Sequence, residues 1–161
     1  MLKVNILCIG KVKEKYFAEA IAEYSKRLGA FCKFSITELA EERLRGSAPG
    51  EAQIGEVISA EGKRLLAKIA PYDFVAAMCI EGKQLSSEEL SQTLDNAALR
   101  GKSTVVFVIG GSYGLSGEVK SRADLRLSMS RMTFPHTLAR VILTEQIYRA
   151  FEISSGGKYH K

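Results

Sequence analysis

Apolar runs alternate with amphipathic segments along the whole chain. Runs of β-formers predict five strands, and segments with apolar residues three or four positions apart predict five helices after them. The strands are expected at 2–10, 31–39, 73–80, 103–111 and 125–130, and the helices at 13–29, 52–70, 86–101, 116–123 and 137–153. The polar segment 40–51, which contains Gly46, Pro49 and Gly50, predicts a mobile loop.

This alternation predicts an α/β domain with a mostly parallel sheet. The segments 73–80 and 103–111 are almost wholly apolar, which is typical of strands covered by helices on both faces. Ser86 and Glu89 form a capping-box pattern at the start of the third helix. A length of 161 residues suits one domain, expected to span 1–161.

The composition excludes several classes of protein. Apolar residues make up 46% and charged residues 25%, which is an ordinary globular balance. No apolar run approaches the roughly 20 residues of a membrane helix, and Lys3 and Asn5 interrupt the first run, so neither a membrane span nor a signal peptide is expected. The three cysteines are widely spaced, which favours small buried side chains in a reducing cytoplasm. Two distant histidines give no metal cluster.

The positive charge is concentrated in the last third of the chain. Residues 1–99 contain 13 Lys and Arg against 14 Asp and Glu, and residues 100–161 contain 10 against 4. The net charge is therefore −1 in the first part and +6 in the second. Such a face attracts a polyanion such as RNA or DNA, although charge alone equally fits a basic surface that only aids solubility.

The segment FVIGGSYGLSGE (107–118) joins the end of a strand to closely spaced glycines. Ligands of parallel α/β sheets bind beyond the carboxyl ends of strands. The spacing GG-x-x-G-x-x-G matches neither the dinucleotide fingerprint nor a P-loop, so a backbone-lined pocket for a smaller ligand remains. The alternative is a tight turn in which Gly110 and Gly111 only supply positive φ angles.

The segment 127–140 also runs from a strand through a loop into a helix. Its loop contains Met129, Met132 and Phe134, and apolar loop side chains of this kind line a pocket or meet a partner. The following helix is apolar nearly all round, which favours burial by dimerisation.

Three segments together resemble one known family: FVIGGSYGL, LSMSRMTFPHTLARVILTEQIYRAF and the terminal YHK. The chain is similar to the bacterial ribosomal RNA large-subunit methyltransferase H family, which are pseudouridine N3-methyltransferases of the SPOUT class. The similarity begins at MLKVNILCIGKVKEKYF and is most specific in the last 60 or so residues.

The resemblance implies a deep trefoil knot near the C-terminus, a homodimer, S-adenosylmethionine as cofactor, and large-subunit (23S) rRNA in the assembled ribosome as substrate. It implies cytoplasmic activity with no metal. By the same resemblance, the cofactor-binding residues would be Met78, Gly110, Met129, Ser130, Arg131, Met132, Thr133 and Phe134. The catalytic residues would be His160, Tyr159 and Arg149.

The catalytic residues each have a plainer explanation. His160 could be a disordered chain end, and Arg149 could form a surface ion pair with Glu145 one helical turn earlier. With the resemblance, His160 becomes the expected base for the N3 proton, Tyr159 a contact of the target base, and Arg149 a stabiliser of its negative charge. His136 is expected to orient the pocket loop. Lys158 stands where many family members have proline, and with Gly156 and Gly157 before it we expect a flexible tail.

Other functions stay open at this point. The same chemistry could act on another RNA such as tRNA, or the chain could be a non-catalytic ribosome-binding factor. A hydrolase with an oxyanion hole is disfavoured because the chain lacks a G-x-S-x-G segment.

Overall fold

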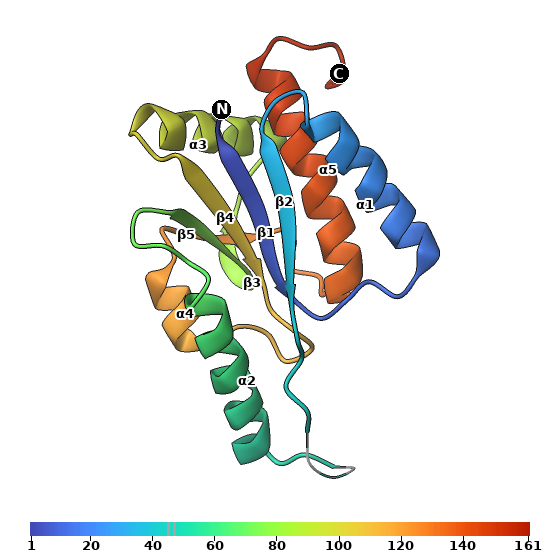
Figure 1. Ribbon diagram of the computed structural model, residues 1–161, viewed down its shortest axis with the longest axis vertical. Helices are drawn as coiled ribbons and strands as arrows, with labels where there is room; N and C mark the ends of the chain where they lie inside the picture. The colour runs from blue at the N-terminus through green and yellow to red at the C-terminus, as the bar shows by residue number, and fades with distance from the viewer. Residues whose placement is uncertain (45, 47) are drawn as a thin grey trace.

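Strands and helices alternate along the molecule, as the sequence predicts. The structure is a computed structural model that describes residues 1–44, 46 and 48–161. Its elements are β1 (Lys3–Ile9), α1 (Lys15–Leu28), β2 (Lys33–Leu39), α2 (Glu51–Leu66), β3 (Phe74–Gln84), α3 (Ser87–Leu99), β4 (Thr104–Ile109), α4 (Gly117–Arg122), β5 (Leu125–Ser128) and α5 (His136–Ser154). The strands pair in parallel in the order β2-β1-β4-β3-β5, which confirms the α/β class (Figure 1).

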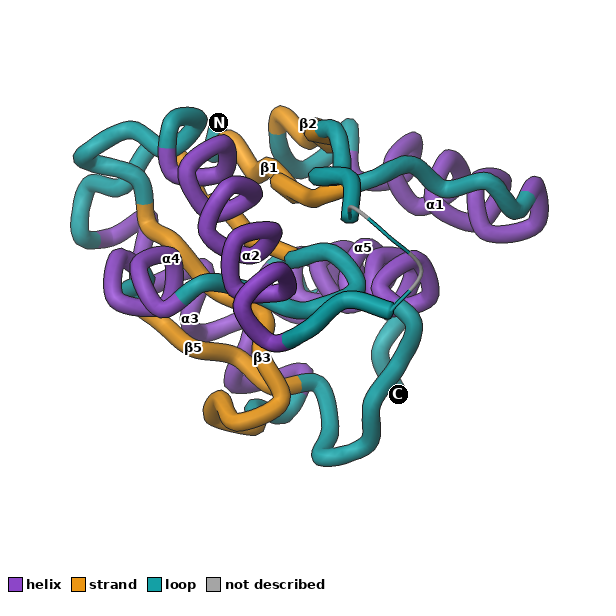
Figure 2. Tube along the Cα trace, turned by 90° about the horizontal axis from the view of Figure 1, so that it is seen from below, coloured by secondary structure: helices purple, strands orange, loops and turns teal. Residues whose placement is uncertain are grey.

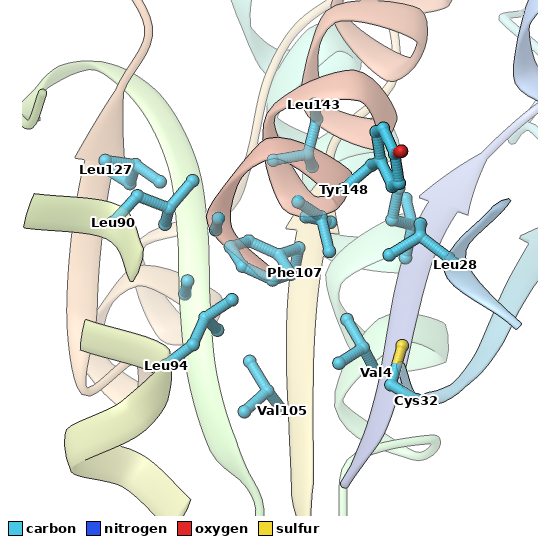
Figure 3. Packing of buried hydrophobic residues seen from close by; sticks show 14 of the residues in the cluster. Val4, Leu28, Cys32, Leu90, Leu94, Val105, Phe107, Leu127, Leu143 and Tyr148 are labelled. Atoms are coloured by element: carbon cyan, nitrogen blue, oxygen red, sulfur yellow. The ribbon is translucent and has the colours of Figure 1, made fainter. Parts of the chain in front are cut away.

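Side chains of the central strands alternate between two apolar cores, because successive residues of a strand point to opposite faces. The larger core lies between the sheet and α1, α3 and α5, and Val4 and Phe107 belong to it. Figure 3 shows Phe107 pointing from β4 toward Leu143 and Tyr148 of α5. The smaller core, which contains Leu65 and Val119, joins the opposite face to α2 and α4. Both faces therefore carry helices, as the apolar strands predict.

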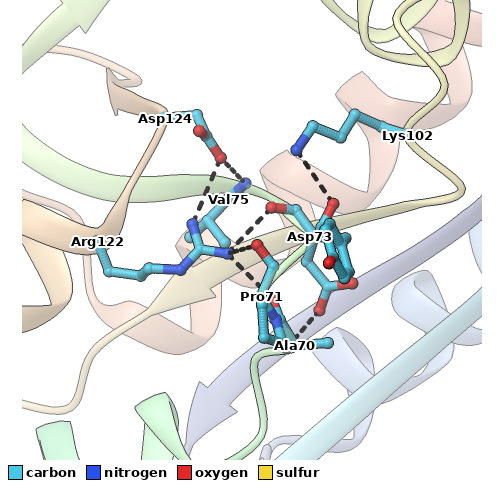
Figure 4. Close-up of polar contacts among 8 residues, drawn as sticks. Ala70, Pro71, Asp73, Val75, Lys102, Arg122 and Asp124 are labelled. Atoms are coloured by element: carbon cyan, nitrogen blue, oxygen red, sulfur yellow. Dashed lines mark hydrogen bonds and ion pairs between the residues drawn. The ribbon is translucent and has the colours of Figure 1, made fainter.

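Helix α2 is shorter than the sequence predicts. It ends at Leu66 instead of Ala70, and it extends beyond the end of the sheet, in the foreground of Figure 2. Lys68 N–H donates to Leu65 O at 3.0 Å, a three-residue turn that tightens the helix end. Arg122 then donates to the carbonyls of Ala70 and Asp73 at 3.0 and 3.1 Å (Figure 4). These contacts hold the chain in a turn before β3.

The two strands at one edge also differ from their predicted bounds. β3 continues to Gln84, and its pairing with β5 shifts register between Met78 and Lys83. β5 ends at Ser128 because the chain turns there, with Ser128 Oγ donating to Ser130 O at 3.0 Å. Both features move backbone out of the sheet near the carboxyl ends of the strands, which is where the cavity described below lies.

Other sequence expectations have a clear outcome. The capping box of Ser86 and Glu89 at α3 is confirmed. Cys8 and Cys32 are buried, as expected, whereas Cys79 is half-buried. The predicted loop 40–51 includes Arg45 and Ser47, which lie outside the described residues. In the described part of the chain, no helix is long and apolar enough to cross a membrane.

Candidate active site

A cavity of about 790 Å³ opens at the carboxyl ends of β3, β4 and β5. Three segments form most of its wall: 78–81 from the irregular part of β3, 109–115 after β4, and 127–136 between β5 and α5, without Arg131. Lys120 and Ala139 complete it. Its size falls within the roughly 300–1,000 Å³ usual for small-molecule sites. The fold thus brings the two segments singled out in the sequence, 107–118 and 127–140, to one place.

The glycine segment after β4 folds back on itself. Gly114 N–H donates to Gly111 O at 3.1 Å, and Gly114 has a φ angle of +86°. A Cβ atom on Gly110 would lie 2.7 Å from the carbonyl carbon and oxygen of Gly114. The alternative, in which Gly110 and Gly111 only supply positive φ angles, is therefore wrong. Gly114 has the positive φ angle, and Gly110 is needed because the backbone returns so closely.

The cavity wall combines apolar side chains with a few polar groups. Met78, Met129 and Phe134 supply apolar surface, and Ser128 and Ser130 lie on the same wall. At the cavity, Lys120 forms an ion pair with Glu81, and this hydrogen bond lowers the pKa of the Glu81 carboxyl. Exposed backbone groups with a few polar side chains suit a ligand that has an apolar body and several hydrogen-bonding edges.

Seven of the eight residues expected to bind cofactor line this cavity: Met78, Gly110, Met129, Ser130, Met132, Thr133 and Phe134. Arg131 is absent from the lining, and its side chain is exposed. The backbone turns at Ser130, whose Oγ accepts a hydrogen bond from Met132 N–H at 3.0 Å. His136, expected to orient this loop, begins α5 and also lines the cavity.

The residues expected to be catalytic gather at the other end of α5. The helix ends in a glycine turn: Gly156 has a φ angle of +72°, Gly156 N–H donates to Ile153 O at 3.1 Å, and Gly157 N–H donates to Glu152 O at 2.8 Å. These two bonds are the Schellman pattern that ends many helices. The turn reverses the chain, and Tyr159 packs on Tyr148 with ring centroids 4.8 Å apart. The flexibility expected of this tail stays a prediction.

Tyr159, His160 and Arg149 share one network of polar contacts. Tyr159 OH donates to Glu145 Oε1 at 2.9 Å, and Arg149 Nη2 donates to the same oxygen at 2.6 Å. Arg149 Nη1 lies 3.2 Å from His160 Nδ1, and the guanidinium stacks 4.7 Å from the centre of the Tyr159 ring. Burial, and next the bond to Glu145, raise the pKa of Tyr159, so its hydroxyl keeps the proton that it donates. His160 Nε2 lies 2.6 Å from Glu88 Oε1. We call Glu88, Glu145, Arg149, Tyr159 and His160 the tail network.

The cavity lies at the start of α5 and the tail network at its end. Figure 1 shows the course of this helix toward the C-terminus. His136 is at the cavity and Arg149 is in the network, and a rise of about 1.5 Å per residue separates them by roughly 20 Å. Buried Arg140 ties the intervening helix to the sheet, donating to Glu38 Oε2 at 2.6 Å and to Gly10 O at 3.2 Å. Within one chain, the expected cofactor residues and catalytic residues do not meet.

The sequence matches a known family over almost its whole length. The model described as "Predicted SPOUT methyltransferase" matches residues 2–160. The chain belongs to the SPOUT methyltransferase family. A ribosomal RNA large subunit methyltransferase H from Streptococcus pneumoniae strain CGSP14 is 48% identical over 160 residues, covering 99% of this chain and 100% of the relative. The proteins of that name from S. pneumoniae strains D39 and TIGR4 match to the same extent.

Solved structures of two other proteins have a similar fold. A probable methylase family protein from Haemophilus influenzae Rd KW20 has a TM-score of 0.52 at 13% identity, covering 100% of this chain and 72% of that one. A ribosomal RNA small subunit methyltransferase E from Neisseria gonorrhoeae, bound to S-adenosyl methionine, has a TM-score of 0.50 at 10% identity, covering 91% and 65%. At these identities the likeness concerns the fold alone.

Sequence reasoning missed several groups at both ends of this SPOUT chain. Glu81 and Lys120 line the cavity, and no local pattern marks a contact between residues 39 positions apart. Glu88 in the first turn of α3 contacts His160 across 72 positions. Glu145 was visible as an ion-pair partner of Arg149, but its bond to Tyr159 depends on the reversed tail. Among the described residues, no group of three or more His, Cys, Asp or Glu side chains could hold a metal ion.

Proposed function

We propose that this chain transfers a methyl group from S-adenosylmethionine to N3 of a pseudouridine in the large-subunit rRNA of the assembled ribosome. The observation that carries the proposal is the 48% identity over the full length to relatives named ribosomal RNA large subunit methyltransferase H. Membership of the SPOUT family and the cavity at the glycine turn support the methyl-transfer chemistry. The net charge of +6 in residues 100–161 supports an RNA substrate.

The cavity suits S-adenosylmethionine, which has an adenine, a ribose and a charged methionine tail. Backbone groups of 109–115 and 127–136 can bind the edge of the adenine, and Met78 and Phe134 can cover its faces. At the wall, Lys120 offers a positive charge for the carboxylate of the methionine tail, and Glu81 offers a negative charge for its amino group. The close return of Gly114 over Gly110 leaves no room for a side chain at this turn. When bound, the cofactor supplies a methyl group already activated by its sulfonium.

The chain's own part in the reaction is then positioning and proton removal. N3 of a pseudouridine carries a proton that must leave before the nitrogen is a good nucleophile. We assign its removal to His160, a contact with the target base to Tyr159, and stabilisation of the developing negative charge to Arg149. Arg149 contacts both His160 and the ring of Tyr159, and Tyr159 bonds the same Glu145 oxygen as Arg149, which supports a joint role.

The separation of the two ends of α5 favours a site built by two copies of the chain. Reacting groups must approach to about 3–3.5 Å, whereas roughly 20 Å of helix separates the cavity from Arg149. On α5, the apolar side chains of Leu138, Val141 and Ile142 are only half-buried and lie outside both apolar cores. We propose that a homodimer covers this surface and brings the tail network of one copy to the cavity of the other.

Two alternative functions are disfavoured. The 48% identity to ribosomal RNA methyltransferases argues against tRNA as the substrate, and the intact cavity argues against a chain that binds ribosomes without catalysis. The trefoil knot, the one-domain organisation and the cytoplasmic location stay predictions.

Label transfer tests the proposal directly. Purified chain is incubated with methyl-labelled S-adenosylmethionine and, in separate reactions, assembled ribosomes, isolated large subunits and tRNA, with ribosomes from cells that lack the enzyme. We expect label in large-subunit rRNA from assembled ribosomes, at N3 of a pseudouridine on nucleoside analysis. Label in tRNA alone would replace the substrate, and absence of both label and cofactor binding would reject the enzyme.

A further inference from the structure

Glu145 lies at the centre of the tail network. Its Oε1 accepts hydrogen bonds from Arg149 Nε at 3.0 Å, Arg149 Nη2 at 2.6 Å and Tyr159 OH at 2.9 Å. Its Oε2 accepts from Gln146 Nε2 at 2.8 Å, and Gln146 Oε1 in turn accepts from Ser87 Oγ of α3 at 2.6 Å. One carboxylate therefore joins the last helix, the returning tail and, through Gln146, a second helix.

An ordinary ion pair on a helix surface looks different, and the chain contains one. Glu23 and Arg27 on α1 have the same spacing and are joined by a contact of 2.9 Å, with side chains 54% and 42% exposed. Exposed pairs of this kind contribute little to stability. The side chain of Glu145 is only 17% exposed, and its Oε1 accepts from Tyr159 OH as well as from Arg149. The number of donors and the burial separate Glu145 from a simple surface partner.

The contacts of Arg149 extend the effect of Glu145 to His160. A guanidinium only donates hydrogen bonds, so Nδ1 of His160, which faces Arg149 Nη1 at 3.2 Å, accepts one. The proton of the neutral ring then sits on Nε2, which faces Glu88 Oε1 at 2.6 Å. Glu145 orients the guanidinium, and the guanidinium orients the ring and sets its tautomer.

We propose that Glu145 is the positioning residue of the tail network, holding Tyr159 and, through Arg149, His160 in the geometry that methyl transfer needs. This role rests on the function proposed above. Glu145 does not line the cavity, so it acts on the catalytic side chains and not on cofactor binding. The proposal also assigns the lone pair that takes a proton to Nδ1 of His160, which becomes available when Arg149 turns from the ring to the target base.

The first test separates turnover from binding in the full-length chain. Glu145→Gln keeps the size of the side chain and removes its charge, and Glu23→Gln is the matched control on α1. We expect Glu145→Gln to lower kcat for label transfer to ribosomes on the order of 10–100-fold, with unchanged calorimetric affinity for S-adenosylmethionine. Glu23→Gln should retain wild-type kcat. If Glu145 acts through Tyr159, the losses in Glu145→Gln and Tyr159→Phe should be strongly non-additive in the double variant.

The second test measures the tautomer of His160 directly and does not depend on methyl transfer. The chain has two histidines, so nitrogen-15 spectra of the imidazole rings resolve each. We expect the Nε2–H tautomer at His160 in the wild-type chain and a tautomer mixture in Glu145→Gln, while His136 is unchanged.

Wild-type kcat in Glu145→Gln, additive losses in the double variant, or an unaltered His160 tautomer would each overturn the positioning role while leaving the proposed function intact. A wild-type chain that binds S-adenosylmethionine but labels no RNA would overturn the proposed function, and the role of Glu145 in it.

Discussion

The two ends of α5 are surrounded by different kinds of chemical group. The cavity end consists largely of backbone and apolar side chains, with a close glycine turn and the ion pair of Lys120 and Glu81 at its wall. The tail end consists of charged and aromatic side chains bonded to one another, with Glu145 shared by several donors. A backbone wall holds a ligand in place, and a network of ionisable groups moves protons. The contrast supports the division proposed above, with cofactor binding at one end of the helix and chemistry at the other.

Replacing His160 should have the largest effect of the variants described here, and the effect should be on turnover. We expect His160→Ala to lower kcat by about 10²–10⁴-fold, because positioned general bases contribute on that order. The calorimetric Kd for S-adenosylmethionine should stay at the wild-type value. A variant that kept near-wild-type kcat with normal cofactor binding would remove His160 from the mechanism.

Gly110→Ala should act at the cavity end, by weakening the binding of the cofactor. Its Cβ would meet the Gly114 carbonyl group at 2.7 Å, so the turn must open. We expect cofactor affinity to fall about 100-fold, equivalent to about 2.7 kcal/mol, measured by calorimetry. Gly117→Ala is the control, since a Cβ there meets nothing within 4 Å. Equal affinities in the two variants would contradict a cofactor site at this turn.

Two glycines that end helices can be compared to test whether the reversed tail contributes to turnover. Gly156 and Gly101 have φ angles of +72° and +81°, and a Cβ on either meets nothing within 4 Å. Alanine at each should cost about 1 kcal/mol of stability, seen as similar losses in Tm. Only Gly156→Ala should also lower kcat, by about fivefold if the penalty falls on tail placement. Matching kcat values in the two variants would show that the reversal has no part in turnover.

The smallest effect concerns a carboxyl group behind the cavity. Glu61 of α2 is buried, and burial raises its pKa, with Glu41 and Glu42 adding to the rise and Glu42 N–H and Arg64 opposing it. A carboxyl whose folded pKa is raised holds its proton more tightly in the folded chain, so stability falls as pH rises from the unfolded pKa to the folded one.

Glu61→Gln should therefore raise Tm at pH 8 and change it little at pH 4, as followed by thermal unfolding. Glu56→Gln, an exposed position on the same helix, should show no such difference between the two pH values. An equal gain in Tm for Glu61→Gln at pH 4 and pH 8 would show that the charge of Glu61 does not cause the gain.

The cavity end could be predicted from sequence because its signals are local. Strands rich in β-formers, glycines directly after β4, and apolar side chains in 129–134 are all visible within short windows. What stayed hidden is geometry within those windows. The positive φ angle belongs to Gly114, and Arg131 points to solvent because the chain turns at Ser130.

The tail end was less predictable because its contacts depend on packing between distant elements. Glu145 and Arg149 share a helical turn, so their pairing is readable, but Tyr159 reaches them only after the reversal at Gly156. Glu88 comes to His160 because α3 packs beside α5. The end of α2 at Leu66 likewise depends on Arg122, more than 50 positions away, bonding the carbonyl of Ala70.

Helix α5 gives the molecule one further property. It starts at the cavity wall, is bonded to the sheet through Arg140 and ends in the tail network. One rigid helix therefore connects the two sites. Because linkage is reciprocal, any coupling that this helix carries from the cavity to the tail network acts with the same factor from the tail network to the cavity.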